Sequence, residues 1–256
     1  MQLTTLHWGE PTGVTAVCVH GITGNAVSWG RVATHLVSAG YHVVAPELRG
    51  HGNSPAPPSG YALDELVGDL VDTVGSEVDV LIGHSFGGTL ATIAVAQGRI
   101  RVHHVLLEDP VLAMPDKEHA AAVVDPIIAQ TRVGLGDVAA QEPQWSLTDI
   151  AGRVLAQYQM SASAVRQAWV GNAPWDLHTE VGRLTGHADV LVVLPECSPY
   201  SDTEDIGRMR RGLGENHVIE IAGAGHSVHL DRPKEFLAVL DTLINGRSTN
   251  SSTHGG

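Results

Sequence analysis

Six short apolar runs, separated by segments of helical periodicity, constrain the fold more than any other feature of the sequence. Each run is nearly continuous in apolar residues, which is typical of parallel strands covered by helices on both faces. The runs are VTAVCVH (14–20), HVVAP (42–46), VDVLIG (78–83), VHHVLLE (102–108), DVLVVL (189–194) and HVIEI (217–221). Helical segments, most with a Gly or Pro boundary, lie between or after them: WGRVATHLVSAG, ALDELVGDLVDTVG, GGTLATIAVAQG and DRPKEFLAVLDTLI. This alternation predicts an α/β fold with a mostly parallel sheet flanked by helices.

The segment 111–178 interrupts the alternation. It contains no clear strand, but it contains three segments of helical character: KEHAAAVVDPIIAQTR, LTDIAGRVLAQYQ and SASAVRQAWVG. We expect 111–178 to be a helical cap insertion over one end of the sheet, with 1–110 and 179–246 forming the core. Helices in regular crossover positions are the alternative. The small polar tail, 247–256, is expected to be disordered.

Composition excludes several classes of protein. The chain is 43% hydrophobic and 17% charged, as in ordinary globular proteins. A net charge of −13 without a basic cluster argues against nucleic acid as a partner, because the phosphate backbone is neutralised by Lys and Arg. No apolar run approaches the roughly 18–20 residues of a membrane span, and the first residues do not resemble a signal peptide. Cys18 and Cys197 are too few for a disulfide framework. We therefore expect a cytoplasmic protein.

The motif Gly-x-Ser-x-Gly, formed by GHSFG at 83–87, carries the sharpest chemical signal. It follows a buried strand and leads directly into a helix, which is the setting of a nucleophile elbow. A serine at such a strained turn, with glycines where bulk would clash, has its hydroxyl exposed at the carboxyl end of the strand. The N–H of Phe86 would then lie at a helix N-terminus, where it favours a developing oxyanion.

Two other segments complete a candidate site. His20 and Gly21 end the first apolar run, so the N–H of Ile22 can supply a second oxyanion donor. The loop GAGHSVHLDRP (223–233) follows the last strand and places His226 after Ser85 in the chain order expected for this chemistry. His229 is the nearest rival, although it falls closer to the following helix.

With these motifs in this order, the chain resembles the α/β-hydrolase superfamily. The matching pieces are VHG (19–21), LRGHGNS (48–54), GHSFGG (83–88) and GAGHSVHLDRP (223–233), and 111–178 matches the cap domain of that family. The resemblance implies a serine nucleophile but not a particular substrate. One departure is Glu47, where relatives usually have Asp.

The resemblance also implies a carboxylate that orients the histidine, in the loop after DVLVVL. The family position falls on Ser198, which cannot carry that charge. One hypothesis takes the acid from the end of the preceding strand, as Glu108 or Asp109. Alternation allows only one of the two to face the histidine, and the longer reach favours Glu108. A second hypothesis takes it from Asp202, with Asp205 and Glu196 as weaker candidates, and a third leaves the site without an acid.

The function implied is that of a serine hydrolase. Ser85 would attack a small ester, lactone or thioester to form an acyl-enzyme, with His226 as the base. Trp145 and Trp169 in the cap are candidate substrate contacts, beside Trp175 and Met160, although packing of cap on core explains them equally well. Acyl transfer to a nucleophile other than water, or a ligand-sensing module with little turnover, are the alternatives. No metal or cofactor motif is present in the sequence.

Overall fold

The computed structural model describes residues 1–11, 13–129 and 133–246, and the tail at 247–256 lies outside the described residues. Its main sheet has seven strands in the order β1-β3-β2-β4-β5-β8-β9. Only the edge strand β1 is antiparallel, pairing with β3. The strands are β1 (Thr5–Trp8), β2 (Thr15–Val19), β3 (His42–Pro46), β4 (Glu77–His84), β5 (Arg101–Glu108), β8 (Asp189–Pro195) and β9 (Val218–Ile221). The predicted fold class is confirmed: this is the α/β-hydrolase fold.

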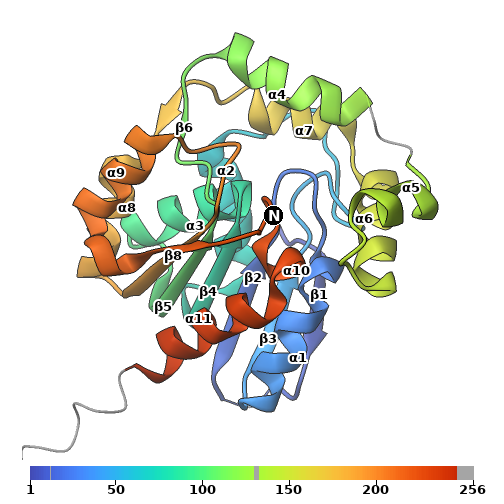
Figure 1. Cartoon of the computed structure of the whole chain (residues 1–256). Helices are drawn as coiled ribbons and strands as arrows, with labels where there is room; N and C mark the ends of the chain where they lie inside the picture. The colour runs from blue at the N-terminus through green and yellow to red at the C-terminus, as the bar shows by residue number, and fades with distance from the viewer. Residues whose placement is uncertain (12, 130–132, 247–256) are drawn as a thin grey trace, which may run out of the picture.

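Helices cover both faces of the sheet (Figure 1). Along β2, Ala16 and Cys18 belong to one apolar cluster and Val17 and Val19 to the other, because successive side chains of a strand point to opposite faces. The first cluster includes α1 and α11; the second includes α2, α3 and α8. The core helices are α1 (Gly30–Ser38), α2 (Leu63–Val74), α3 (Phe86–Ala96), α8 (His178–Arg183), α9 (Thr203–Leu213), α10 (Val228–Asp231) and α11 (Pro233–Asn245).

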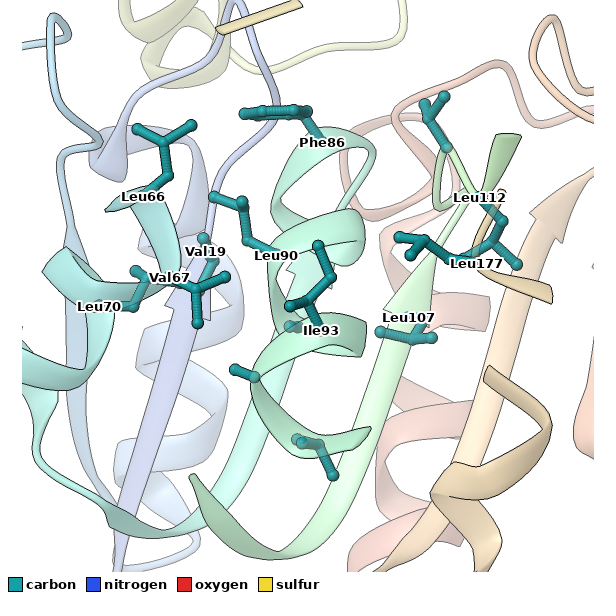
Figure 2. Packing of buried hydrophobic residues seen from close by; sticks show 14 of the residues in the cluster. Val19, Leu66, Val67, Leu70, Phe86, Leu90, Ile93, Leu107, Leu112 and Leu177 are labelled. Atoms are coloured by element: carbon teal, nitrogen blue, oxygen red, sulfur yellow. The ribbon is translucent and has the colours of Figure 1, made fainter. Parts of the chain in front are cut away.

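Helix α3 is buried around its whole circumference, since every residue from Phe86 to Val95 is buried. Figure 2 shows Leu90 and Ile93 of α3 in one cluster with Val19 of β2 and Leu107 of β5. Leu90 is completely buried, and burying a leucine side chain contributes roughly 1.5–3 kcal/mol. This packing fixes the N-terminal end of α3 against the carboxyl ends of the central strands.

The helices described between residues 111 and 177 are grouped at one end of the molecule (Figure 1). They are α4 (Lys117–Ala129), α5 (Leu135–Gln141), α6 (Leu147–Gln159) and α7 (Ala162–Trp169). The segment 111–178 also holds a feature that the sequence did not indicate, a two-stranded antiparallel pair of β6 (Ala113–Met114) and β7 (Trp175–Asp176). This pairing joins the two ends of the segment. No helix in the described ranges is long and apolar enough to cross a membrane.

Candidate active site

Ser85 occupies the turn between β4 and α3. Its φ of 54° lies in the left-handed region, which costs energy for a residue with a side chain and is found where surrounding structure enforces it. The N–H of Ser85 donates to the carbonyl of Glu108 on the neighbouring strand (2.8 Å), which anchors the turn to the sheet. The side chain is almost entirely buried, but it lines a cavity of about 390 Å³.

The peptide groups that carry the N–H of Ile22 and of Phe86 are both held by their carbonyl ends. The Gly21 carbonyl accepts from Gly24 N (2.9 Å) and from His20 Nδ1 (2.7 Å). The Ser85 carbonyl accepts from the N–H of Thr89 at 3.1 Å. Since C=O and N–H point in opposite directions across a planar peptide, fixing each carbonyl fixes the following N–H. These two N–H groups donate to no acceptor within the described residues.

His226 lies on the loop after β9 and lines the same cavity as Ser85. Its Nδ1 donates to Oδ2 of Asp109 at 2.6 Å, a short distance typical of a charge-assisted hydrogen bond. Because a carboxylate only accepts, this bond places the proton on Nδ1 and leaves the lone pair on Nε2. Asp109 itself is completely buried.

Glu108, the carboxylate expected to face His226, faces His229 instead. Its oxygens accept from the backbone N–H of His229 (2.8 Å) and from Nδ1 of the same residue (2.8 Å). Burial disfavours the charged form, but the charge and hydrogen bonds of His229 outweigh it and hold the pKa of Glu108 below its usual range. Asp109 reaches His226 because its backbone turns at a φ of 38°, just beyond the strand end. As the alternation along a strand predicted, only one of the two carboxylates contacts His226. It is Asp109 rather than Glu108, so the longer side chain of Glu108 was the wrong basis for the choice.

The other candidate acids lie elsewhere. Asp202 caps α9 by accepting from the N–H groups of Glu204 (2.8 Å) and Asp205 (2.9 Å). Asp205 lies near Nε2 of His178 at 3.3 Å, and Glu196 accepts from Gly223 N at 2.9 Å. No contact joins these three carboxylates to His226 within the described residues.

Ser198 stands where the family resemblance places the acid, and the structure connects it to Asp109. Its hydroxyl donates to Oδ1 of Asp109 at 2.6 Å, on the oxygen that His226 does not use. The same hydroxyl accepts from the N–H groups of Tyr200 (3.1 Å) and Ser201 (3.0 Å). The sequence marked position 198 as anomalous but gave no sign of this contact.

The rings of His84 and Tyr200 both pack against the ring of His226, and in each case the two ring centroids are 4.6 Å apart. Nε2 of His84 also donates to the carbonyl of His226 at 3.0 Å, which holds the loop. Burial lowers the pKa of His84 to about 3, so the ring stays neutral beside His226. Burial raises the pKa of Tyr200, with the charge of Asp109 adding to the effect. Sequence reasoning did not identify either residue.

The cavity is lined by residues of the core loops and of 111–178. Trp145 is among them, and its Nε1 donates to Asp231 at 2.6 Å. Trp169 is not among them: it is completely buried and packs against Phe86, with ring centroids 5.8 Å apart. The expectation that Trp169 contacts substrate is therefore not met by its position. Within the described ranges, no cluster of three or more His, Cys, Asp or Glu residues is arranged to hold a metal ion.

A mostly parallel seven-stranded sheet with a serine at the turn between its central strand and helix defines a class of protein, the α/β hydrolases. The sequence matches the Alpha/beta hydrolase family over residues 16–239, and the chain belongs to that family.

Among known proteins, the chain is 28% identical to "Lipase LipV" of Mycobacterium tuberculosis, over 96% of this chain and 99% of that protein. It is 24% identical to the mouse "sn-1-specific diacylglycerol lipase ABHD11", over 92% and 82% of the two chains. Among solved structures, E-2-(acetamidomethylene)succinate hydrolase matches with a TM-score of 0.79, at 22% identity and 95% coverage of both chains. At 22% identity, this structural similarity shows a shared fold and no more. The relatives named as lipases support a hydrolase.

Proposed function

We propose that this protein is a serine hydrolase of small ester-like substrates, with Ser85 as nucleophile, His226 as base and Asp109 as the orienting carboxylate. One observation carries the proposal: His226, in the cavity that Ser85 lines, is bonded through Nδ1 to a buried carboxylate at 2.6 Å. That bond leaves Nε2 as the proton acceptor, as the chemistry requires. The relatives named lipases act on esters by name, which agrees with the proposal.

The reaction proceeds in two halves. Nε2 of His226 takes the proton of the Ser85 hydroxyl as Oγ attacks the substrate carbonyl, and the N–H groups of Ile22 and Phe86 stabilise the oxyanion. The imidazolium, stabilised by Asp109, then protonates the leaving oxygen and the acyl-enzyme forms. Water attacks the acyl carbon in the second half, giving its proton to Nε2, and Ser85 recovers its proton as the carboxylic acid departs.

We also infer that 111–178 acts as a cap over a core of 1–110 and 179–246. Two observations support it. The pairing of β6 with β7 brings the ends of the segment together, and residues from its helices, such as Val138 of α5 and Arg153 of α6, line the cavity that contains Ser85. An insertion held at its base in this way excludes water from the reacting groups without contributing to the sheet.

The test is labelling of Ser85 by a fluorophosphonate probe together with hydrolysis of 4-nitrophenyl acetate. We expect the wild-type protein to be labelled and to release 4-nitrophenol, and Ser85→Ala to do neither. Ser28 is a matched control, because it lines the same cavity but donates to the carbonyl of Asn25 (2.8 Å) and follows no strand. Ser28→Ala should retain both properties. An unlabelled wild type whose hydrolysis equals that of Ser85→Ala contradicts the proposed function and favours a binding module.

A further inference from the structure

Arg153 of α6 lines the cavity that also contains Ile22 and Thr23. Its Nη1 donates to the carbonyl and to Oγ1 of Thr23, both at 3.2 Å. Thr23 directly follows Ile22, whose N–H is a proposed oxyanion donor. The guanidinium is therefore held on the same side of the cavity as the position of a reacting carbonyl oxygen.

No carboxylate in the described residues forms an ion pair with Arg153 within 4.0 Å. Other arginines of the protein do have such partners: Arg31 pairs with Asp149 at 2.8 Å, and Arg49 pairs with Asp69 at 2.7 Å. Arg153 is half-buried, and a cation partly removed from water without a counter-ion is unfavourable, so an anion that enters the cavity would relieve this.

The acidic groups on the cavity wall are occupied by other donors. Asp149 is bonded to Arg31, and Asp231 accepts from Trp145 Nε1 and Gly225 N. Glu142 accepts from Gln144 Nε2 at 3.0 Å. Burial lowers the pKa of Arg153, and the nearby Tyr200 and Glu142 partly offset this, but a guanidinium keeps its proton at any ordinary pH. Arg153 is the sole Arg or Lys among the described residues that line this cavity.

The donors that remain on Arg153 match a carboxylate. Nε and Nη2 donate to no acceptor in the described residues, and neither is among the fully buried polar atoms. Both atoms therefore keep solvent-accessible surface. The edge of a guanidinium presents parallel N–H groups that match the two oxygens of a carboxylate, a fit that a point charge does not provide.

We propose that Arg153 binds a carboxylate on the substrate, so that the preferred substrates are half-esters of short dicarboxylic acids. The inference rests on the proposed serine hydrolase function, because it places the anion in the cavity that contains Ser85. The ester carbonyl lies at Ser85 and the distal carboxylate at Arg153, with a short chain between them.

The test compares two esters with the same five-carbon acyl chain, mono-4-nitrophenyl glutarate and 4-nitrophenyl pentanoate. They differ at the end of the chain, where one has a carboxylate and the other a methyl group. We expect wild-type kcat/KM to be at least about tenfold higher for the glutarate ester, after subtraction of its rate with Ser85→Ala. Arg153→Met should lower kcat/KM for the glutarate ester by roughly ten- to a hundredfold more than it lowers the pentanoate value, as for loss of a charged hydrogen bond. Arg153→Lys should recover part of the preference.

Arg166 offers a matched control. It lies on α7, outside the cavity, and its Nε pairs with Asp125 at 2.9 Å. Arg166→Met should leave the ratio of the two kcat/KM values unchanged. Equal losses on both esters in Arg153→Met, or a wild type without preference for the glutarate ester, overturn the proposal while the serine hydrolase function stands.

Binding of glutarate to Ser85→Ala, measured by calorimetry, gives a readout that does not depend on turnover. We expect binding that the added substitution Arg153→Met removes. If the wild type hydrolyses neither ester faster than Ser85→Ala does, the proposed serine hydrolase function fails. The binding of glutarate then tests by itself whether Arg153 forms a carboxylate subsite. Glutarate that does not bind, or that binds equally with and without Arg153, overturns it.

Discussion

At the scale of single residues, two consecutive carboxylates serve two different histidines. Glu108 is bonded to His229 in a completely buried pair, where the histidine ring stacks on Trp29 with centroids 4.4 Å apart. Asp109 is bonded to His226, whose side chain is 27% exposed and faces the cavity. His229 also lines this cavity, but its side chain is only 2% exposed, so exposure of the ring is what distinguishes the two pairs.

Substitution of the two carboxylates should have different consequences. Asp109→Asn removes the acceptor that sets the tautomer of His226, so we expect kcat to fall by about 10⁴-fold. Glu108→Gln breaks a buried pair, so we expect the free energy of unfolding to fall by about 3–5 kcal/mol, with kcat of the folded protein changed less than about tenfold. Ester hydrolysis and urea unfolding of both variants check this. A Glu108→Gln variant with the larger kinetic loss would return the role to Glu108.

Ser198 provides a rescue experiment for the same assignment. Its hydroxyl lies 2.6 Å from Oδ1 of Asp109, so a carboxylate at position 198 would enter the same polar pocket. The double variant Asp109→Asn/Ser198→Asp should recover part of the activity that Asp109→Asn loses. Recovery of activity would show that the loss lies in orientation of the histidine rather than in folding.

The sequence placed Glu108 and Asp109 ahead of Asp202 as candidate acids and favoured Glu108, whereas Asp109 is the carboxylate that contacts His226 in the structure. The choice depends on the left-handed backbone turn at Asp109, where φ is 38°. A carboxylate at a strand end gives no local signal for such a turn, because the surrounding loops impose it. The strained turn at Ser85 could be predicted, because the flanking glycines of the Gly-x-Ser-x-Gly motif indicate it in the sequence.

At the scale of elements, the close approach of α3 to β2 depends on glycine at position 87. A Cβ on Gly87 would collide with the backbone carbonyl oxygens of Val19 and His20, and one on Gly83 would lie 2.6 Å from Gly87 O. These contacts are with backbone, which cannot move aside as a side chain end can. Both glycines therefore fix the turn that carries Ser85.

Gly87→Ala should displace α3 and with it the Phe86 N–H. We expect a loss of about 1–3 kcal/mol in the free energy of unfolding, as for overpacking, together with a fall in kcat of at least about 10²-fold, as for loss of an oxyanion donor. Gly136→Ala in α5 is the matched control, because its added Cβ meets nothing within 4 Å. There we expect an unchanged or slightly higher stability. Equal behaviour of the two variants would contradict the close-packing argument.

The elements that the sequence predicted are those with a continuous or periodic apolar pattern. All six apolar runs form strands, and α1, α2, α3 and α11 lie where their periodicity indicated. The edge strand β1 was not predicted, because its residues are only partly buried and its signal is weak. Helix α9 was missed for a similar reason: its sequence, TEDIGRMRRGL, is mostly polar and buries only Met209 and Leu213.

At the scale of the whole molecule, buried histidines connect stability to pH. His20 donates from Nδ1 to Gly21 O and accepts from the Leu48 N–H at Nε2 (3.0 Å), so its ring must be neutral. Burial lowers the pKa of His20 to about 3, with the charge of His51 adding to this. In the unfolded chain a histidine titrates at about 6.5. Below that pH the unfolded state binds the proton and the folded state does not, so stability falls as pH falls from about 6.5 toward 3.

Glu47, whose Oε2 lies 3.7 Å from Nε2 of His20, has the opposite effect. Burial raises the pKa of Glu47 to about 7, although a hydrogen bond from the Ala26 backbone opposes this. The folded state then holds a proton that the unfolded state releases above about 4.5, so stability falls as pH rises from about 4.5 to 7. The two neighbouring groups therefore contribute slopes of opposite sign over the same interval, which makes each a control for the other.

Urea unfolding of His20→Gln and Glu47→Gln between pH 4.5 and 7 tests this pairing. For His20→Gln, we expect the stability advantage of the wild type to shrink as pH falls, by up to about 1.4 kcal/mol per pH unit below 6.5. For Glu47→Gln, we expect the stability of the wild type relative to the variant to increase as pH falls. A gap independent of pH in both variants would mean that neither side chain changes its protonation on unfolding. If the stability difference between wild type and variant changes with pH in the same direction for both variants, His20 and Glu47 titrate as a coupled pair that shares one proton.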